Sequence, residues 1–302
     1  MEKFYGTGVA MITPFKANGE IDFQALGNLI DYLLDGGVNY LVSLGTTGET
    51  VTLNEEERKA IWAFTANHVN GRVPLVAGIG GNNTLEVVSQ IKKFDHKGYD
   101  AILSASPNYN KPTQEGIYQH YKLIAQNSPL PIILYNVPSR TGSNVNAETT
   151  VRLAREFKTI IGIKEASGNF DLLNQLFRDK PKDFLVISGD DPITLPMVAM
   201  GGVGIISVTG NALPAATTAM VNLCLKGDFK QAQPINFSLI EFTRLMFKEG
   251  NPAGVKAALK QLGVTGDTLR LPLVPVSKET ETLIAAELDK INNLSPTTIV
   301  SH

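Results

Sequence analysis

Short apolar runs rich in β-branched residues alternate with longer segments over the first two thirds of the chain. The runs are apolar nearly throughout, which is typical of parallel strands that are covered on both faces. We predict strands at Gly8–Thr13, Tyr40–Leu44, Pro74–Gly78, Ala101–Ser104, Ile132–Tyr135, Ile160–Lys164, Phe184–Ser188 and Gly204–Val208.

The longer segments between these runs place apolar residues at helical spacing. They predict helices at Phe23–Leu34, Glu55–Asn67, Leu85–Lys97, Glu115–Gln126, Ala147–Arg155 and Leu172–Phe177. Capping signals support two of the helix starts. Asn54 precedes Glu57 by three residues, as in a capping box, and Asp22 can begin the first helix.

The strand spacing of roughly 20 to 35 residues suits the βα units of a closed barrel. We therefore predict an α/β fold, a (β/α)8 TIM barrel; a doubly wound sheet is the alternative, because the same alternation can build either. After the eighth strand the alternation gives way to helical patterns, at Pro214–Leu225, Lys230–Phe247, Pro252–Leu262 and Lys278–Asn292.

This change in pattern divides the chain into two expected parts. We expect a catalytic barrel over residues 1–225 and a C-terminal helical bundle, packed on the barrel, over residues 226–302. Asn251 is predicted to cap the third of the late helices, with Pro252 at its first position. The last residues, Ser295–His302, are expected to be frayed.

Composition narrows the class of partner. The 27 Lys and Arg residues nearly balance the 29 Asp and Glu residues, so no basic surplus favours nucleic acid. No apolar run is long enough to span a bilayer, and no signal-peptide pattern opens the chain, so we expect a cytoplasmic protein without membrane contact. The single cysteine, Cys224, excludes an intrachain disulfide, and the four scattered histidines match no metal motif.

Lys164 closes an otherwise apolar predicted strand. In a βα barrel the active site lies at the C-terminal ends of the strands. Burial lowers the pKa of a lysine and favours the neutral amine, which is the nucleophilic form. The position alone fits equally well a lysine whose ammonium reaches out to solvent or pairs with a carboxylate.

Other polar groups follow neighbouring predicted strands. Gly45–Glu49 brackets two threonines with glycines, a turn that can direct N–H and hydroxyl groups at an anion. Tyr135 and Arg140 follow the fifth strand and suit proton transfer and carboxylate binding, although an amphipathic rim residue and a surface ion pair explain them as well. Asp190 and Asp191 are interpreted as turn and capping residues.

Three segments together resemble a known group of enzymes. They are Gly45–Glu49, Tyr135–Gly142 and Gly162–Gly168, and they are similar to the pyruvate-dependent class I aldolases related to N-acetylneuraminate lyase. Within that group, the segment that contains Arg140 points to the dihydrodipicolinate synthase family. The resemblance covers nearly the whole chain.

The resemblance implies a role for each matching residue. Lys164 would form a Schiff base with pyruvate, and Thr46 and Thr47 would hold the pyruvate carboxylate. Tyr135 would shuttle protons in a relay with Thr46 and with Tyr109, the latter reaching in from a neighbouring subunit.

The second half of the reaction depends on other positions. Arg140 would bind the carboxylate of L-aspartate-4-semialdehyde, and Gly189 and Ile206 would contribute backbone groups. The implied lyase reaction condenses pyruvate with this aldehyde in the diaminopimelate route to lysine. It needs no metal or organic cofactor, and a homotetramer made of two dimers is expected. The alternatives are a sister aldolase that splits N-acetylneuraminate or a 2-keto-3-deoxy sugar acid, and a non-catalytic barrel.

A set of positions matches the effector site of lysine-sensitive members only in part. Asn82 and Glu86 match, whereas Asn108 stands where many members have a second tyrosine. Glu55 and Arg58 stand where some have histidines. We therefore expect weak or absent inhibition by lysine.

Overall fold

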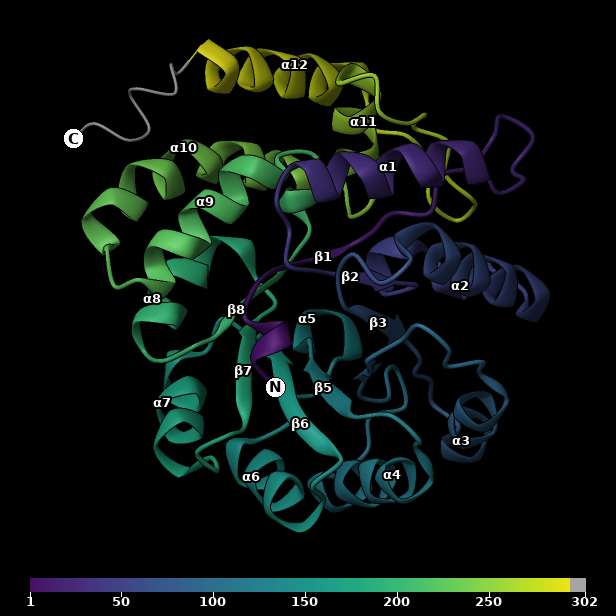
Figure 1. Ribbon diagram of the computed structural model, residues 1–302, viewed down its shortest axis with the longest axis vertical. Helices are drawn as coiled ribbons and strands as arrows, with labels where there is room; N and C mark the ends of the chain where they lie inside the picture. The colour runs from purple at the N-terminus through teal and green to yellow at the C-terminus, as the bar shows by residue number, and fades with distance from the viewer. Residues whose placement is uncertain (294–302) are drawn as a thin grey trace.

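The strands close into a parallel barrel, in the order β1 to β8 along the chain (Figure 1). This computed structural model describes residues 1–293, so the expected fraying of 295–302 lies outside the described residues. The strands are β1 Gly6–Ala10, β2 Tyr40–Ser43, β3 Leu75–Gly78, β4 Ala101–Ala105, β5 Ile132–Asn136, β6 Ile160–Glu165, β7 Leu185–Ser188 and β8 Gly204–Ser207. The barrel prediction is confirmed, and the doubly wound alternative is wrong because β8 pairs with β1.

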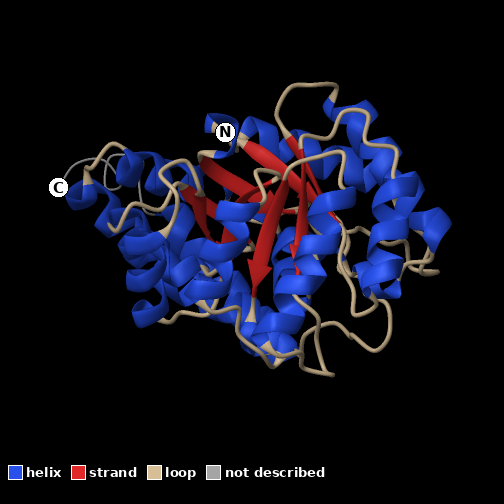
Figure 2. Cartoon of the chain, turned by 90° about the horizontal axis from the view of Figure 1, so that it is seen from below, coloured by secondary structure: helices blue, strands red, loops and turns tan. Residues whose placement is uncertain are grey.

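Helices surround the strands, which form the centre of the molecule (Figure 2). They are α1 Phe23–Asp35, α2 Glu55–Val69, α3 Thr84–Lys93, α4 Gln114–Asn127, α5 Pro138–Thr141, α6 Ala147–Glu156, α7 Phe170–Asp179, α8 Thr194–Ala199, α9 Pro214–Leu225, α10 Phe229–Lys248, α11 Ala253–Gln261 and α12 Lys278–Asn293. None of these helices of residues 1–293 has the length and apolar content needed to cross a membrane.

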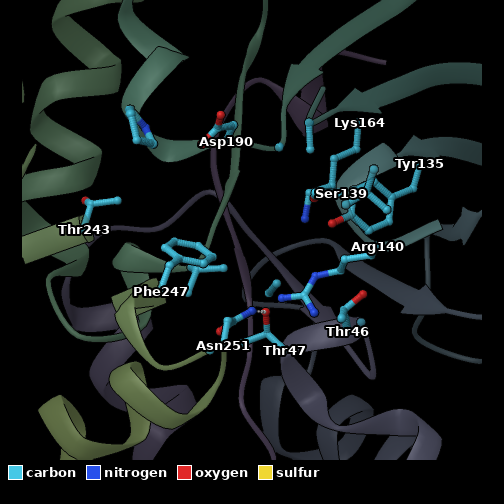
Figure 3. A pocket seen from close by; sticks show the side chains of 18 of the residues that line it. Thr46, Thr47, Tyr135, Ser139, Arg140, Lys164, Asp190, Thr243, Phe247 and Asn251 are labelled. Carbon is cyan, nitrogen blue, oxygen red and sulfur yellow. Dashed lines mark hydrogen bonds between the residues drawn. The ribbon is translucent and has the colours of Figure 1, made fainter. Parts of the chain in front are cut away.

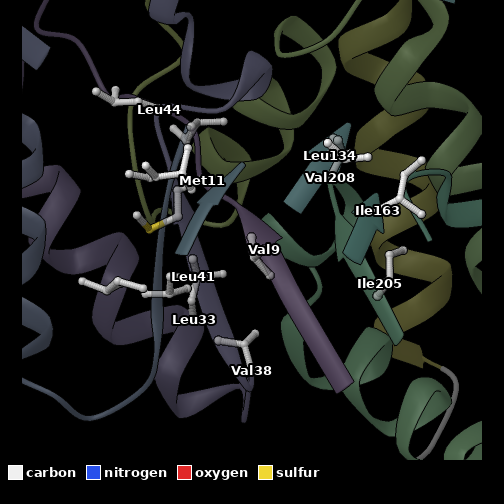
Figure 4. Packing of buried hydrophobic residues seen from close by; sticks show 14 of the residues in the cluster. Val9, Met11, Leu33, Val38, Leu41, Leu44, Leu134, Ile163, Ile205 and Val208 are labelled. Carbon is white, nitrogen blue, oxygen red and sulfur yellow. The ribbon is translucent and has the colours of Figure 1, made fainter. Parts of the chain in front are cut away.

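Successive strand residues point to two separate cores. Leu134 and Ile163 belong to the outer cluster between strands and helices (Figure 4), whereas Ile133 and Tyr135 belong to the cluster inside the barrel. Because strand side chains alternate between the two faces, Lys164 follows the outward Ile163 and faces inward. The alternation of side chains along β6 therefore places the Lys164 side chain on the inner face of the barrel, at the end of the strand.

Two of the differences between the predicted and the observed boundaries have the same reason. The first strand was expected at Gly8–Thr13 but spans Gly6–Ala10, since the buried loop after it is as apolar as the strand. The third helix was expected to reach Lys97 but ends at Lys93. Phe94 leaves the helix to pack against Trp62 and Tyr99, with ring centroids 4.7 and 5.1 Å away. In both cases, apolar residues that take part in tertiary packing made the predicted element run too far at its C-terminal end.

The late helices pack beside the barrel, where α10 contacts both α9 and α12 (Figure 1). A buried ion pair joins them to the end of β2. The Nζ atom of Lys256 on α11 lies 2.5 Å from Oε1 of Glu49, and both side chains are fully buried. Lys256 also donates to the Thr268 carbonyl at 2.8 Å, and the Arg270 N–H donates to Glu49 Oε2 at 3.1 Å. Both charges are thus paired and hydrogen-bonded.

We predict that Lys256→Met lowers the free energy of unfolding by about 3–5 kcal/mol, because it leaves the Glu49 carboxylate buried and unpaired. Adding Glu49→Gln removes that charge and should recover part of the loss. Denaturant unfolding of the full chain measures both. Lys278→Met, which removes an exposed pair with Glu281, is the matched control and should leave the free energy of unfolding nearly unchanged. If Lys256→Met and Lys278→Met lowered the free energy of unfolding equally, the prediction would be refuted.

Candidate active site

A cavity of about 990 Å³ lies over the C-terminal ends of the strands (Figure 3). One wall comes from strand ends and the loops that follow them, and the other comes from α10 and the segment after it. The lining residues labelled in Figure 3 are Thr46, Thr47, Tyr135, Ser139, Arg140, Lys164, Asp190, Thr243, Phe247 and Asn251. The cavity therefore gathers most of the predicted site residues.

Lys164 lies in this cavity with 4% of its surface exposed. Its register partner on β5 is Tyr135, and its Nζ atom lies 4.4 Å from the centre of that phenol ring. Burial lowers the pKa of Lys164 to about 8, the charge of Asp191 opposes this shift, and the charge of Arg140 adds to it. Much more of the neutral amine, which is the nucleophilic form, is therefore present at neutral pH than in an ordinary lysine.

Gly189, which follows β7, gives the lysine side chain its room. A Cβ atom at this position would lie 2.9 Å from Lys164 Cγ and 2.8 Å from Ala166 Cβ. Such contacts are too short for packed carbon atoms, so a side chain at this position would push the amine aside. Ile206 was expected, like Gly189, to contribute a backbone group to the site. It is fully buried in the inner cluster and is not among the residues that line the cavity.

Tyr135 is buried beside the amine, with 7% of its surface exposed. Burial raises the pKa of this phenol to about 12, while the charge of Arg140 and a hydrogen bond with Thr46 act in the opposite direction. The phenol is therefore protonated at neutral pH, next to both a cation and a hydroxyl. It is placed to donate a proton to a reacting group and to recover one through Thr46.

Thr46 and Thr47 lie in a 3-10 turn directly after β2. Thr47 is buried, and its Oγ1 accepts a hydrogen bond of 2.9 Å from Nδ2 of Asn251. The prediction that Asn251 caps a helix was wrong: α11 begins at Ala253, and Pro252 occupies the cap position. An Asn-Pro pair is a common sequence signal for the start of a helix, but here the asparagine side chain lines the cavity instead.

Arg140 lies on the short helix α5, in the loop that follows β5. The loop is tied to β6 through the buried Asn136, whose Nδ2 donates to Glu165 Oε2 at 2.8 Å and to Asn144 Oδ1 at 2.7 Å. The Val145 N–H in turn donates to Asn136 Oδ1 at 2.9 Å. These bonds connect the arginine loop to the strand that carries the lysine.

Asp191 begins the 3-10 turn Asp191–Ile193 after β7, in agreement with its interpretation as a turn residue, but its charge also acts on Lys164, which the sequence did not indicate. Its buried carboxylate accepts hydrogen bonds from the Ser207 hydroxyl and, at 3.1 Å, from the Val208 N–H, so it caps no helix. Burial raises the pKa of Asp191, and these two bonds and the charge of Lys164 oppose that shift. An Asp-Asp-Pro turn carries no sequence signal of such a contact, because turns favour aspartate in general.

The structure brings Tyr109 to the surface rather than into its own chain's cavity. It is 93% exposed and holds a left-handed φ of 58°. The predicted effector residues also lie outside the cavity. Asn82 exchanges two hydrogen bonds of 2.8 Å with the backbone of Asn108, and Glu86 is exposed.

The described part of the chain contains no group of three or more His, Cys, Asp and Glu side chains that could hold a metal ion. The cavity offers an amine, a phenol, hydroxyls and a guanidinium, together with the carboxylate of Asp190.

Comparisons with known proteins agree with this geometry. The model of the dihydrodipicolinate synthetase family matches residues 3–291. A 4-hydroxy-tetrahydrodipicolinate synthase of Flavobacterium psychrophilum is 52% identical over 92% of this chain and 95% of its own length.

Solved structures show the same similarity over almost the whole fold. The dihydrodipicolinate synthase of Thermotoga maritima superposes with a TM-score of 0.94 at 40% identity, over 96% of this chain and 99% of that one. A second structure, described as a monomeric dihydrodipicolinate synthase variant, has a TM-score of 0.93 at 40% identity, over 96% and 97% of the two chains. The chain belongs to the dihydrodipicolinate synthetase family.

Proposed function

We propose that this chain is a lyase that condenses pyruvate with L-aspartate-4-semialdehyde through a Schiff base on Lys164, giving 4-hydroxy-tetrahydrodipicolinate for lysine and diaminopimelate biosynthesis. The names of its relatives support the reaction. The observation that carries the mechanism is the buried Lys164 amine, with its pKa lowered to about 8, in one cavity with Tyr135 and Arg140.

The first half of the reaction uses the amine and the phenol. The neutral Lys164 amine attacks the keto carbon of pyruvate while Tyr135 donates a proton to the oxygen, which leaves as water when the iminium forms. Hydroxyl and N–H groups of the Thr46–Gly48 turn hold the pyruvate carboxylate. Loss of a methyl proton then gives the enamine, a carbon nucleophile.

The second half needs an aldehyde that carries a carboxylate. The guanidinium of Arg140 binds that carboxylate, so that the enamine carbon attacks the aldehyde. The amino group of the bound product then attacks the iminium carbon, closes the ring and releases Lys164. Arg140 suits a short acidic aldehyde better than a sugar chain, which favours the synthase over the sister aldolases.

We also propose that Tyr109 completes the proton relay in a second copy of the chain, within a homotetramer. Tyr109 and Val51 are 93% and 95% exposed, and a cavity of about 350 Å³ runs from Val51 and Asn108 to Tyr135. Such exposed apolar residues beside a cavity suit a surface covered by a partner. Weak or absent inhibition by lysine stays a prediction, and it is supported by the Asn82 amide, which already bonds to the Asn108 backbone. A cytoplasmic location also stays a prediction.

Borohydride trapping separates the two halves of the reaction. We expect pyruvate and borohydride to add a reduced adduct to Lys164 in peptide mass mapping, and Lys164→Ala to abolish it. Arg140→Met should keep the adduct and lower kcat/KM for aspartate semialdehyde by about 10²-fold, as the loss of a charged hydrogen bond does. An adduct on Lys111 instead, or faster turnover with N-acetylmannosamine or glyceraldehyde than with aspartate semialdehyde, would refute the proposal.

The pH dependence follows from the lowered pKa of Lys164. The reactive amine is the deprotonated form, so the rate of adduct formation with pyruvate should rise about tenfold per pH unit below pH 7 and level off above about pH 9. The midpoint near pH 8 should move upward in Arg140→Met, because the arginine charge lowers the pKa of Lys164. A midpoint above pH 10 in the wild-type chain would contradict the desolvated amine.

The role of Tyr109 across subunits can be tested by complementation. Tyr109→Phe should lower kcat by about 10²-fold, the usual contribution of a proton-transfer group. Co-expression of this variant with Lys164→Ala chains should restore part of the activity, since a mixed oligomer contains sites with an intact lysine and an intact tyrosine. Sedimentation velocity reports the size of the assembly. No recovery in a confirmed mixed oligomer would place Tyr109 outside the relay.

A further inference from the structure

Asn251 connects the C-terminal helices to the turn that faces the substrate cavity. It lies in the segment between α10 and α11, it is buried with 8% of its surface exposed, and it lines the same cavity as Lys164 (Figure 3). Its Nδ2 donates to Thr47 Oγ1 at 2.9 Å, across a separation of 204 residues in the chain. The contact is therefore a tertiary feature that neither segment can form alone.

The direction of this hydrogen bond controls the Thr47 hydroxyl. A threonine hydroxyl has one hydrogen to donate and lone pairs with which to accept. Because Oγ1 of Thr47 accepts from Asn251, its own hydrogen remains available for another acceptor. Within residues 1–293, no hydrogen bond uses that hydrogen for a protein acceptor.

The other end of the amide is left without a hydrogen bond from residues 1–293. Oδ1 of Asn251 is buried and has no hydrogen-bond partner among the described residues. A buried acceptor without a partner costs free energy. The same two segments are also joined by the Glu49–Lys256 ion pair, so the structure has a separate contact that holds them together.

We propose that Asn251 is a positioning residue that directs the hydroxyl hydrogen of Thr47 toward the carboxylate of pyruvate. The proposal rests on the proposed function, because it needs an anion in front of the turn. A hydroxyl that is already turned toward an anion binds it without first breaking a bond of its own. Asn251 touches Thr47 and acts on the substrate through that side chain.

Two substitutions at this position separate positioning from packing. In Asn251→Ala the hydroxyl loses its orientation, and the KM for pyruvate should rise about 5-fold, as the loss of a neutral hydrogen bond does. In Asn251→Asp a carboxylate of nearly the same shape can only accept. It takes the Thr47 hydrogen and repels pyruvate, so KM should rise at least about 10-fold further.

Steady-state kinetics of the full chain give the two KM values. KM for aspartate semialdehyde should change less than about 2-fold in both variants, because Arg140 binds that substrate. Asn28→Asp, an exposed change of the same kind on α1, is the matched control and should behave as wild type. If Asn251→Asp binds pyruvate as well as or better than Asn251→Ala, the residue only fills space and the proposal is wrong.

A double-mutant cycle covers the case in which the aspartate variant does not fold. Thr47→Val keeps the shape of the threonine and removes the hydroxyl. Adding Asn251→Ala to Thr47→Val should then change the KM for pyruvate by less than about 2-fold, because the group that Asn251 orients is gone. Fully additive effects would overturn the proposal.

The same samples distinguish this proposal from the function on which it rests. The half-saturating pyruvate concentration for borohydride trapping is measured for the wild type and each variant. A wild-type chain that forms no adduct overturns the proposed function, and this inference with it. Normal trapping in the wild type together with unchanged half-saturation in Asn251→Asp overturns this inference alone.

Discussion

The fully buried ion pair between Glu49 and Lys256 fixes the turn after β2 against the C-terminal helices, and the shape of the cavity depends on it. The turn is short and ends in the left-handed residue Glu49, with φ 53°. A non-glycine residue in the left-handed region costs free energy and persists where its surroundings hold it in place. The ion pair and the Asn251–Thr47 contact supply those surroundings, so the late helices complete a site that the strands alone leave open.

Two lysines show how one physical effect serves two purposes. Burial lowers the pKa of both Lys164 and Lys256 to about 8. Lys256 keeps a carboxylate at 2.5 Å, which opposes the shift, and it has a structural role. Lys164 has an aromatic face at 4.4 Å and an open cavity in front of it. Lys164 makes no ion pair within the described residues, so it can lose its proton without leaving a directly bonded carboxylate unpaired, and it is the amine that we propose to react.

The sequence predicted the barrel well because each strand is covered on both faces, which leaves an apolar run that cannot be mistaken for a surface strand. Lys164, Tyr135 and Arg140 were found because they interrupt or follow such runs. The cap prediction for Asn251 was wrong and the contacts of the Asp191 carboxylate were not foreseen, since an Asn-Pro pair and an Asp-Asp-Pro turn have ordinary local explanations. Their roles arise from contacts with residues far away in the chain, which no local pattern encodes. The division at residue 225 stays a prediction, although residues after it line the cavity.

The charge distribution around Lys164 fits the proposed Schiff base more closely than it fits a free lysine. Desolvation disfavours a positive charge on the amine, yet the iminium carries that charge before the enamine forms and again once the carbon–carbon bond has been made. Asp191, oriented by the Ser207 hydroxyl and the Val208 N–H, is the carboxylate whose charge acts on Lys164. Fixed dipoles and charges stabilise a developing ion without reorganisation. In the proposed mechanism, the lowered pKa of Lys164 makes its neutral form easier to reach before reaction, and Asp191 offers a counter-charge once the iminium has formed.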